Sequence, residues 1–573
     1  MMTTKNYIFI LLLSIFVTGT TFAQNSILRK QGSTSQLVVD GKPFLILGGE
    51  LGNSSASCIP DIERIFPKLQ QIGLNTVLVP VYWDLTEPTE GNFDFTLTDQ
   101  ALKSARQCNL KIIFLWFGTW KNSMSCYAPL WFKKDYQKYP RSYTRNGKPL
   151  EIASAFSENV FQADHRAFSQ WLKHLATVDK HDGTVIMIQI ENEIGMLEDA
   201  RDHSKEANRA FHSPVPQELT SYLQKNKKAL HPRMLEKWSS QGCKTNGNWE
   251  EIFGSGIGTD EIFMAWHYAR YVEKMAQTAR SIFNVPLYVN AAMNSRGRKP
   301  GEYPSAGPLA HLIDVWHCGA PSIDLLAPDL YDQGFAGWVA QYKRPNNPLF
   351  IPETKLTDDN GVRAFYVFGE HDAIGISPFS IEDYPDTPHT PLSKSYAKLK
   401  ELMPLITRYQ GKGAMKGLLF DQENKERILT DDELTVTCRH YYTLPWDARA
   451  TDGSRWPEGG GLLLKLSKDE YLVAGSGIVV EFAKSTEKQY DNPSQASLGE
   501  DGFATRGNNQ APSAKQWKGL RCGLASVDEV KVNGDGSIGY VRRLNGDQSH
   551  QGRHVRIPTD DFKILHVKLY EYQ

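Results

Sequence analysis

The stretch VIMIQIENEIG, residues 185–195, places an unbroken apolar run directly before a cluster of polar side chains. A short apolar run rich in β-branched residues is typical of a parallel strand that is buried on both faces. Seven further runs of this kind occur along the chain, at residues 44–47, 76–81, 111–117, 286–289, 323–327, 348–351 and 373–376. Helical patterns lie between them, so the sequence predicts eight strand-then-helix units.

Eight such units favour a (β/α)8 TIM barrel, an α/β fold. A doubly wound sheet is the competing arrangement, but no glycine-rich nucleotide loop follows the first strand. After about residue 411 the pattern changes to short alternating strands between Gly-rich turns, which predicts an antiparallel, β-sandwich-like domain. We therefore predict the barrel over residues 24–410 and the β-domain over residues 411–573. An irregular stretch near residues 199–258 is far longer than a usual βα loop and predicts an insertion over one barrel face.

The charge of the chain is balanced, with 65 acidic and 64 basic residues and a formal net charge of −1. A nucleic acid or another polyanion would need a basic excess or a basic face, so we expect no such partner. Aromatic residues make up 11% of the chain. They indicate either a large core or a surface that stacks on the flat apolar faces of a ligand.

Residues 1–23 are typical of a signal peptide. Lys5 is followed by an apolar stretch over residues 7–17, and Thr-Phe-Ala at residues 21–23 is a small-x-small cleavage site. The stretch is too short to span a bilayer, and no later run reaches about 18 residues. We predict a secreted protein, periplasmic or extracellular, without a membrane anchor. The seven cysteines are odd in number and form no CxxC pair, which permits disulfides but disfavours a zinc site.

Two predicted strands end in glutamates. The fourth run continues into Glu191, Asn192 and Glu193, and Glu353 follows the seventh run. Barrel active sites form at the C-terminal ends of strands, so these carboxyl groups can face each other across the barrel mouth. Glycoside cleavage with retention of configuration requires such a pair, about 5–5.5 Å apart. A lone strand-end Glu more often makes an ion pair or caps a helix, but the pair favours catalysis.

The chemistry assigns a role to each carboxyl group. Glu353 must be ionised to attack the anomeric carbon, so hydrogen-bond donors should surround it. Glu193 must be protonated to act as the acid, and its pKa should fall once Glu353 is esterified. Strand alternation puts Glu191 on the same face as Glu193, but Glu193 lies further out, so we assign the ion pair to Glu191. This chemistry needs no cofactor and no metal.

Five segments of the chain resemble, in order, those of glycoside hydrolase family 35 β-galactosidases, within the clan A retaining barrel glycosidases. They are DGKPFLILGGE (40–50), GLNTVLVPVYWDLTEPTEGNFDF (73–95), TWKNSMSCYAPLWF (119–132), IQIENEIG (188–195) and NPLFIPET (347–354). The resemblance is strongest to a bacterial branch with a distinct C-terminal β-domain. It implies that Glu193 is the acid/base, that Glu353 is the nucleophile and that Asn192 hydrogen-bonds the sugar 2-OH. Tyr331, in APDLY, is the implied donor to the nucleophile.

The sequence departs from the family at two places. Gly118-Thr119 stands where the family usually carries Ala-Glu, and Gly52 stands where it carries a polar residue. We expect Glu50 to take over polar contacts to the sugar. Galactose recognition is implied by the resemblance, although not all of its contacts are matched.

Several aromatic residues fall near predicted strand ends, namely Trp83, Trp116, Trp120, Trp131, Trp316 and Phe379. Galactose leaves a continuous C–H face on one side of its ring, on which an aromatic side chain can stack. Trp83 and Trp120 lie in the resembling loops and are the candidate platforms, the alternative being core residues. Asn122 is either a donor to a sugar hydroxyl or a turn residue.

We expect a retaining exo-β-galactosidase that releases terminal β-galactose from oligo- or polysaccharides, with carbohydrate as its partner. One alternative is another clan A retaining β-glycosidase, such as a β-arabinopyranosidase. The other is a catalytically silent glycan-binding protein, against which the intact Glu193 and Glu353 argue because a binder needs neither.

Overall fold

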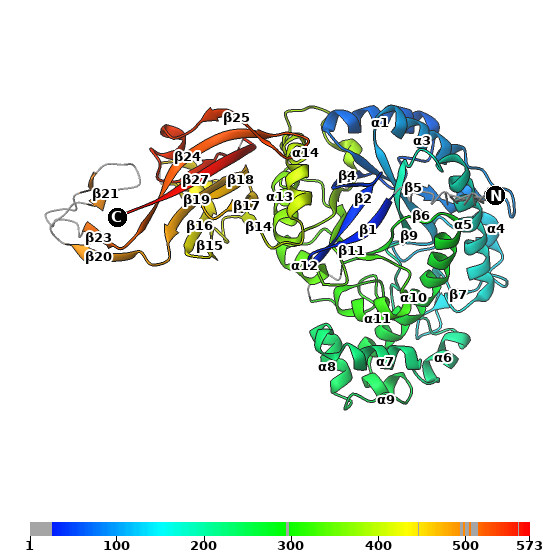
Figure 1. Ribbon diagram of the computed structural model, residues 1–573. Helices are drawn as coiled ribbons and strands as arrows, with labels where there is room; N and C mark the ends of the chain where they lie inside the picture. Colours follow the sequence, from blue (N-terminus) through cyan, green and yellow to red (C-terminus); the bar gives the residue numbers. More distant parts are fainter. Residues whose placement is uncertain are drawn as a thin grey trace, which may run out of the picture.

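The computed structural model describes residues 26–293, 297–444, 446–492, 497–498, 504–505, 514–559 and 561–573. A closed barrel forms one end of the molecule and antiparallel sheets form the other (Figure 1). The predicted signal peptide, residues 1–23, lies outside the described residues.

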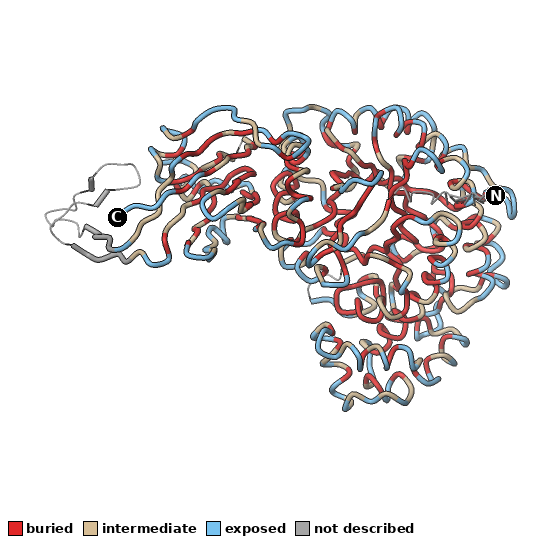
Figure 2. The backbone as a smooth tube through the Cα atoms, in the orientation of Figure 1, coloured by how far each residue is buried: buried red, intermediate tan, exposed pale blue. Residues whose placement is uncertain are grey.

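Eight parallel strands close the barrel in the order β10-β11-β12-β13-β4-β5-β6-β9. They are β4 (Ile46–Glu50), β5 (Thr76–Tyr82), β6 (Lys111–Lys121), β9 (Val185–Asn192), β10 (Leu287–Ala292), β11 (Leu325–Leu330), β12 (Phe350–Thr354) and β13 (Gly375–Pro378). Each predicted apolar run overlaps one of these strands, and the strands are buried along almost their whole length (Figure 2). The barrel is confirmed and the doubly wound alternative is wrong, because the sheet closes on itself.

Helices cover the outside of the barrel. They are α1 (Ile59–Ile72), α2 (Trp83–Thr86), α3 (Thr96–Gln107), α4 (Leu130–Lys134), α5 (Glu158–Val178), α10 (Ile257–Ile282), α11 (Ile313–Gly319), α12 (Phe335–Tyr342), α13 (Asn360–His371) and α14 (Pro391–Tyr409). Gly73 ends α1 with a left-handed φ of 97°. The chain enters the barrel through the sheet β1 (Ser26–Gln31), β2 (Thr34–Val39) and β3 (Lys42–Pro43).

The stretch near residues 199–258, expected to be irregular, is helical. It forms α6 (Lys205–His212), α7 (Gln217–Lys225), α8 (Pro232–Ser239) and α9 (Trp249–Phe253), which project from the barrel in Figure 1. Trp238 and Trp249 are buried in this insertion. The pattern hid these helices because five to nine residues hold too few turns for an apolar period to show.

Two antiparallel sheets follow the barrel, as predicted. The six-stranded sheet has the order β14-β17-β18-β27-β24-β25 and the four-stranded sheet β15-β16-β19-β26. Their strands are β14 (Met415–Phe420), β15 (Glu426–Asp431), β16 (Leu434–His440), β17 (Gly459–Ser467), β18 (Glu470–Ser476), β19 (Ile478–Lys484), β24 (Arg521–Val532), β25 (Ile538–Arg543), β26 (Val555–Ile557) and β27 (Lys563–Tyr572). Buried residues of both sheets, such as Val473 and Val480, share one core, which makes the pair a sandwich.

Three short two-stranded pairings complete the strands of the described residues, one in the barrel and two beyond it. β7 (Arg141–Tyr143) pairs with β8 (Pro149–Ala153) in the barrel. β20 (Lys488–Asn492) pairs with β23 (Ala514–Lys518), and β21 (Ser497–Leu498) with β22 (Ala504–Thr505), at the far end of the sandwich.

The barrel and the sandwich share a packed interface at α13. A Cβ on Gly369 of α13 would lie 2.8 Å from the Leu462 Cβ of β17, so only glycine allows this approach. Arg427 of β15 pairs with Glu370 through two hydrogen bonds of 2.9 and 3.0 Å. Residues of the sandwich such as Leu462 belong to the same hydrophobic cluster as the barrel core. The helix that directly follows strand β12 is therefore fixed against the C-terminal sheets.

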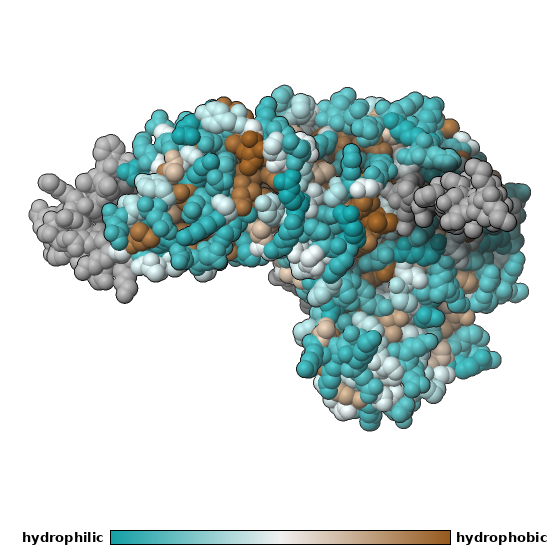
Figure 3. Space-filling model, in the orientation of Figure 1, coloured by the Kyte–Doolittle hydropathy of each residue, from teal (hydrophilic) through white to brown (hydrophobic). Residues whose placement is uncertain are grey.

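The seven cysteines are free thiols. Among the described residues no helix is long and apolar enough to cross a membrane. The face of the molecule in Figure 3 is mostly hydrophilic.

Candidate active site

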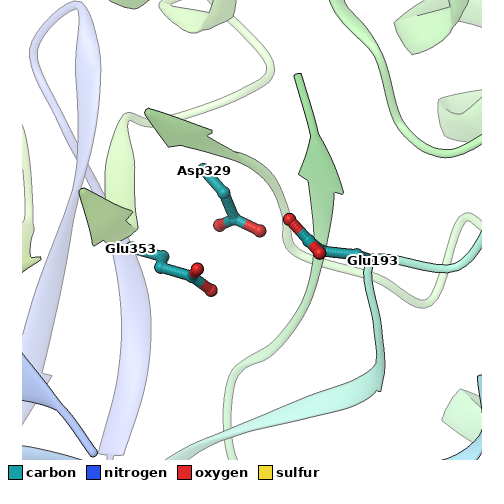
Figure 4. A group of neighbouring side chains, drawn as sticks. All are labelled: Glu193, Asp329 and Glu353. Carbon is teal, nitrogen blue, oxygen red and sulfur yellow. The ribbon is translucent and has the colours of Figure 1, made fainter. Parts of the chain in front are cut away.

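A pocket of about 410 Å³ opens at the C-terminal ends of the barrel strands. Glu193, Asp329 and Glu353 line it, and Figure 4 shows their three carboxyl groups pointing toward a common space. One carboxylate oxygen from each residue lies within 4.8 Å of the other two. The predicted pair thus comes together from β9 and β12, joined by a third carboxyl group from β11.

The backbone beyond Ile190 turns Glu193 into the pocket. Glu191 and Glu193 have left-handed φ angles of 60° and 46°. Such angles are strained for residues with a side chain and cluster at functional sites. The Glu193 N–H donates to the Asn290 side chain at 2.9 Å, which helps to hold this conformation.

The same left-handed turn sends Glu191 away from the pocket. Its carboxyl group accepts a hydrogen bond from the backbone N–H of Trp120 at 2.8 Å. Burial, and then the nearby charge of Asp164, raise the pKa of Glu191 well above its usual value. The expected ion pair of Glu191 is wrong, because no cation pairs with it among the described residues and burial favours its neutral form.

Glu353 stands on β12, almost fully buried. The Tyr331 hydroxyl donates to its Oε1, which places Tyr331 where the resemblance implied. The other carboxylate oxygen is buried and finds no hydrogen-bond partner among the described residues. A carboxylate with one oxygen held and the other unengaged is oriented and ready to react with a ligand.

Glu193 carries the chemical signature that an acid/base requires. Burial, and then the charge of Glu353, raise the pKa of Glu193 to about 7, while Lys121 lowers it. The Asn122 amide donates to the Glu193 carboxyl group, and the Lys121 ammonium donates to Asn122. Asn122, expected to be either a donor to a sugar hydroxyl or a turn residue, therefore contacts Glu193.

Asn192 and Glu50 are buried polar residues without partners. Both amide atoms of Asn192 and both carboxyl oxygens of Glu50 lack hydrogen-bond partners among the described residues. Buried polar groups are normally hydrogen-bonded, so these atoms are available to a ligand group or water. Burial, and then the charge of Glu353, raise the pKa of Glu50 well above its usual value. A neutral Glu50 can donate a hydrogen bond in the interior beside Glu353.

Asp329 was not predicted as a site residue. It is the penultimate residue of β11, pairs in register with Glu353 and accepts a hydrogen bond from Asn290 at 2.6 Å. Burial, then the charges of Glu353 and Glu193, raise its pKa well above the usual value. The signal was present: a charged residue at the end of a buried strand. The predicted apolar run ends at residue 327, so the residue that directly follows the run is not Asp329.

The predicted aromatic platforms are wrong. The side chains of Trp83 and Trp120 are completely buried. Trp120 packs edge-on against Tyr268 and Tyr271, and Trp83 packs against Trp131. Trp120 is buried because β6 bulges. Trp116 pairs with Ile190 of β9, and the next residue of β6 that pairs with β9 is Lys121, so Trp120 lies in the bulge between them.

The aromatic rings that do border the pocket are those of Tyr331 and Phe379. They meet edge-to-face, with centroids 6.4 Å apart. Tyr331 is 46% exposed. These two rings, and not the buried tryptophans, can contact the apolar face of a sugar.

The two departures from the family have structural reasons. A Cβ on Gly118 would lie 2.3 Å from Nε1 of Trp116 and 2.7 Å from the Asp164 carboxylate. Thr119 is buried and donates to Asp164 at 2.7 Å, so neither position reaches the pocket. Gly52 donates its N–H to Glu382 at 2.9 Å.

Oxygen donors such as Glu193, Asp329 and Glu353 suit a hard cation. Tyr331 and Asn122 already occupy one oxygen of Glu353 and one of Glu193. The same carboxyl groups can cleave a glycoside without a metal.

In comparison with known families, part of the chain is similar to β-galactosidases. The family model of glycoside hydrolase family 42, described as β-galactosidase, matches residues 60–253, which include Glu193. A domain of unknown function, DUF5597, matches residues 392–556. The likeness to clan A β-galactosidases stands, whereas the narrower assignment to family 35 is wrong, since the matching model is that of family 42.

A curated relative, a β-galactosidase from Xanthomonas manihotis, is 29% identical over 190 residues. The match covers 31% of this chain and 28% of that relative, so the chain spans about a quarter of its length.

Solved structures that the chain partly matches include Gan42B, a family 42 β-galactosidase from G. stearothermophilus, at 14% identity and a TM-score of 0.44 over 67% of this chain and 59% of that one. A β-galactosidase from Bacillus circulans sp. alkalophilus matches at 14% identity and a TM-score of 0.42, over 63% and 57%. A β-mannanase from the mussel Mytilus edulis matches at 13% and 0.38, over 65% and 97%.

Proposed function

We propose that the protein is a retaining β-galactosidase. The observation that carries this proposal is the carboxyl pair, since one oxygen of Glu193 and one of Glu353 lie within 4.8 Å of each other. Retaining glycosidases hold their carboxyl groups about 5–5.5 Å apart, and inverting enzymes about 6.5–9.5 Å. A closest oxygen–oxygen distance within 4.8 Å favours the shorter separation of a retaining enzyme.

The first step forms a covalent intermediate. The Glu353 carboxylate attacks the anomeric carbon while Glu193 gives its proton to the glycosidic oxygen. The bond between the anomeric carbon and the glycosidic oxygen breaks. Tyr331 orients Glu353 for this attack. The amide of Asn192, which has no partner among the described residues, is available to the sugar 2-OH, where a hydrogen bond strengthens in the transition state.

The second step hydrolyses the glycosyl ester. Esterification removes the charge of Glu353, which is the second-largest cause of the raised Glu193 pKa. Glu193 then has a lower pKa and takes a proton from water, which attacks the anomeric carbon and releases Glu353. Two inversions leave the configuration of the product unchanged.

The test is turnover of aryl glycosides by the wild type and two variants. We expect 4-nitrophenyl β-galactopyranoside to be cleaved, Glu353→Gln to be inactive, and azide to restore Glu193→Ala with an activated leaving group. A product of the opposite anomeric configuration by NMR contradicts the retaining mechanism. Full activity of Glu353→Gln contradicts its role as nucleophile.

A panel of 4-nitrophenyl glycosides tests the sugar. Preferred cleavage of the galactoside supports the proposal. Preferred cleavage of an arabinopyranoside or another β-glycoside identifies the protein as a clan A enzyme with a different sugar specificity. Binding of galactose without turnover of any glycoside contradicts an enzymatic role.

We also propose that residues 1–23 direct export and that the substrate is an external glycan. Mass spectrometry of the natural protein should give an N-terminus at Gln24. An intact Met1 contradicts this proposal.

A further inference from the structure

A second pocket lies next to the catalytic pocket. It measures about 650 Å³ and is formed by the loops after β4 and β13 together with side chains of α1. Asn53 and Phe379 line both pockets, so the two spaces meet at these residues. The second pocket is thus a continuation of the catalytic site.

Its position in the barrel fixes its relation to the substrate. In the circular strand order, β13 lies four strands from β9 in either direction, so the two strands are opposite. Glu193 follows β9 and must protonate the glycosidic oxygen, so the leaving group lies on the β9 side. The second pocket is therefore on the far side of the bound sugar. In a pyranose, O3 and O4 lie across the ring from the anomeric carbon and point toward that side.

The lining of the second pocket fits a neutral, hydroxyl-rich ligand. It carries two cations, Arg64 and Lys68, and two carboxylates, Glu382 and Asp383. Because the two positive and two negative charges balance, the pocket does not favour a charged ligand of either sign. The same side chains can donate hydrogen bonds to hydroxyl groups and accept them.

The junction between the two pockets has an unsatisfied acceptor and an apolar ring. The Asn53 Oδ1 atom is buried and finds no hydrogen-bond partner among the described residues. A buried acceptor of this kind indicates a ligand group or water that completes it. Phe379 is half-buried beside it and can contact the C–H face of a sugar.

We propose that the second pocket binds a neutral sugar carried on O3 or O4 of the galactosyl residue in the catalytic pocket. The enzyme then releases a disaccharide, in place of the single terminal galactose that the sequence led us to expect. This inference rests on the proposed β-galactosidase function and specifies its substrate: glycans whose β-galactosyl residue is itself substituted.

The experiment compares 4-nitrophenyl β-galactopyranoside with the 4-nitrophenyl glycosides of β-1,4- and β-1,3-linked galactobiose. With at least one of the latter, we expect nitrophenol without a lag, intact galactobiose before any free galactose, and kcat/KM above that of the monosaccharide glycoside. Release of galactose first, with a lag in nitrophenol, overturns the second pocket and leaves the proposed function standing. No nitrophenol from any of the three overturns both.

Variants locate the effect. Ser54 lines only the second pocket, and Ser54→Trp should fill it. We expect kcat/KM on the galactobioside to fall at least about tenfold, or about 1.4 kcal/mol, with the monosaccharide glycoside unchanged. Arg64→Ala removes one polar group and should act in the same direction. Ser57→Trp, exposed on the same turn and outside both pockets, is the control. The proposal is overturned if both Ser54→Trp and Arg64→Ala keep the wild-type ratio of kcat/KM on the galactobioside to kcat/KM on the monosaccharide glycoside.

Discussion

Glu191 and Glu193 flank the same asparagine, but their side chains lie in different environments. Glu193 enters the pocket and contacts Asn122, whereas Glu191 points outward to the Trp120 N–H. Positive φ angles at both residues, and not the alternation of an ordinary strand, decide these directions. The environment then sets the chemistry, because Glu193 shares a pocket with Glu353 and Glu191 lies near Asp164.

The pair offers a matched test. Glu193→Gln removes the transferable proton and should lower kcat by about 10²–10⁴-fold on substrates with poor leaving groups. Glu191 is held neutral by its raised pKa, so Glu191→Gln preserves its charge and shape. We expect Glu191→Gln to change kcat/KM by less than about tenfold. Similar losses in both variants contradict the assignment of the acid/base.

The charge of Lys121 should lower the alkaline limit of activity, against the larger effects of burial and Glu353. Glu193 must be protonated in the free enzyme, so kcat/KM should fall as pH rises through about 7. The positive charge of Lys121 lowers that pKa, so Lys121→Met should raise it and move the alkaline limb upward, by up to about one unit. The measurement is the pH profile of kcat/KM. Lys111→Met, at the other end of β6, should leave the profile unchanged, and a downward shift in Lys121→Met contradicts the argument.

At the scale of elements, the bulge in β6 positions a residue that contacts Glu193. Asp164 of α5 accepts hydrogen bonds from Trp116, Thr119 and Tyr271 at 2.7–2.9 Å. These contacts fix the extra residues of the bulge. In the next residues along the chain, Lys121 donates to Asn122, and Asn122 donates to Glu193. A buried hydrogen-bond network behind the pocket thus positions a group inside it.

Gly118 is the point at which this bulge is most sensitive. In Gly118→Ala, the new Cβ would collide with Trp116 and Asp164, which should cost about 1–3 kcal/mol of unfolding free energy. Displacement of Asn122 should also lower kcat. The checks are urea unfolding by tryptophan fluorescence and turnover of the aryl galactoside.

Gly337→Ala in α12 is the matched control, because nothing lies within 4 Å of its Cβ position. It should be neutral or stabilise by up to about 1 kcal/mol. Equal stability of Gly118→Ala and Gly337→Ala contradicts the role of the bulge.

Periodicity predicted the elements well and their irregularities poorly. All eight barrel strands, and the meeting of Glu193 and Glu353 in one pocket, were predicted from apolar runs and from the polar residues at their ends. The buried state of Trp120 depends on the bulge in β6, and the direction of Glu191 depends on one left-handed residue. Neither leaves a periodic signal. Asp329 was missed because its strand continues beyond the apolar run, through Pro328, to Leu330.

At the scale of the whole molecule, the sandwich supports the barrel at the helix behind the nucleophile strand. Gly369 and Gly417 allow α13 and β14 to approach closely, since a Cβ on Gly417 would lie 2.4 Å from the Tyr366 carbonyl oxygen. The Arg363–Glu458 ion pair adds a second polar contact between barrel and sandwich. We therefore expect the two parts to unfold together.

Gly369→Val should uncouple the unfolding of the barrel from that of the sandwich. Its side chain would press on Leu462 and on the Lys416 carbonyl oxygen, 2.8 and 3.0 Å from the Cβ position. We expect calorimetry to resolve two transitions where the wild type shows one, with a modest loss of activity. Gly539→Val, on the edge strand β25 with only ordinary contacts, is the control. One unchanged transition in Gly369→Val contradicts a coupled interface.

The place of β27 in its sheet sets the order of events during synthesis. β27 lies between β18 and β24, so the two halves of the six-stranded sheet join only when residues 563–572 are available. At about 5–20 residues per second, the ribosome needs roughly 10–30 s to travel from β14 to β27. The barrel strands are all made by then, yet α13 still lacks its completed partner sheet. Nascent chains that stall in this interval should be clients of chaperones that bind apolar surfaces.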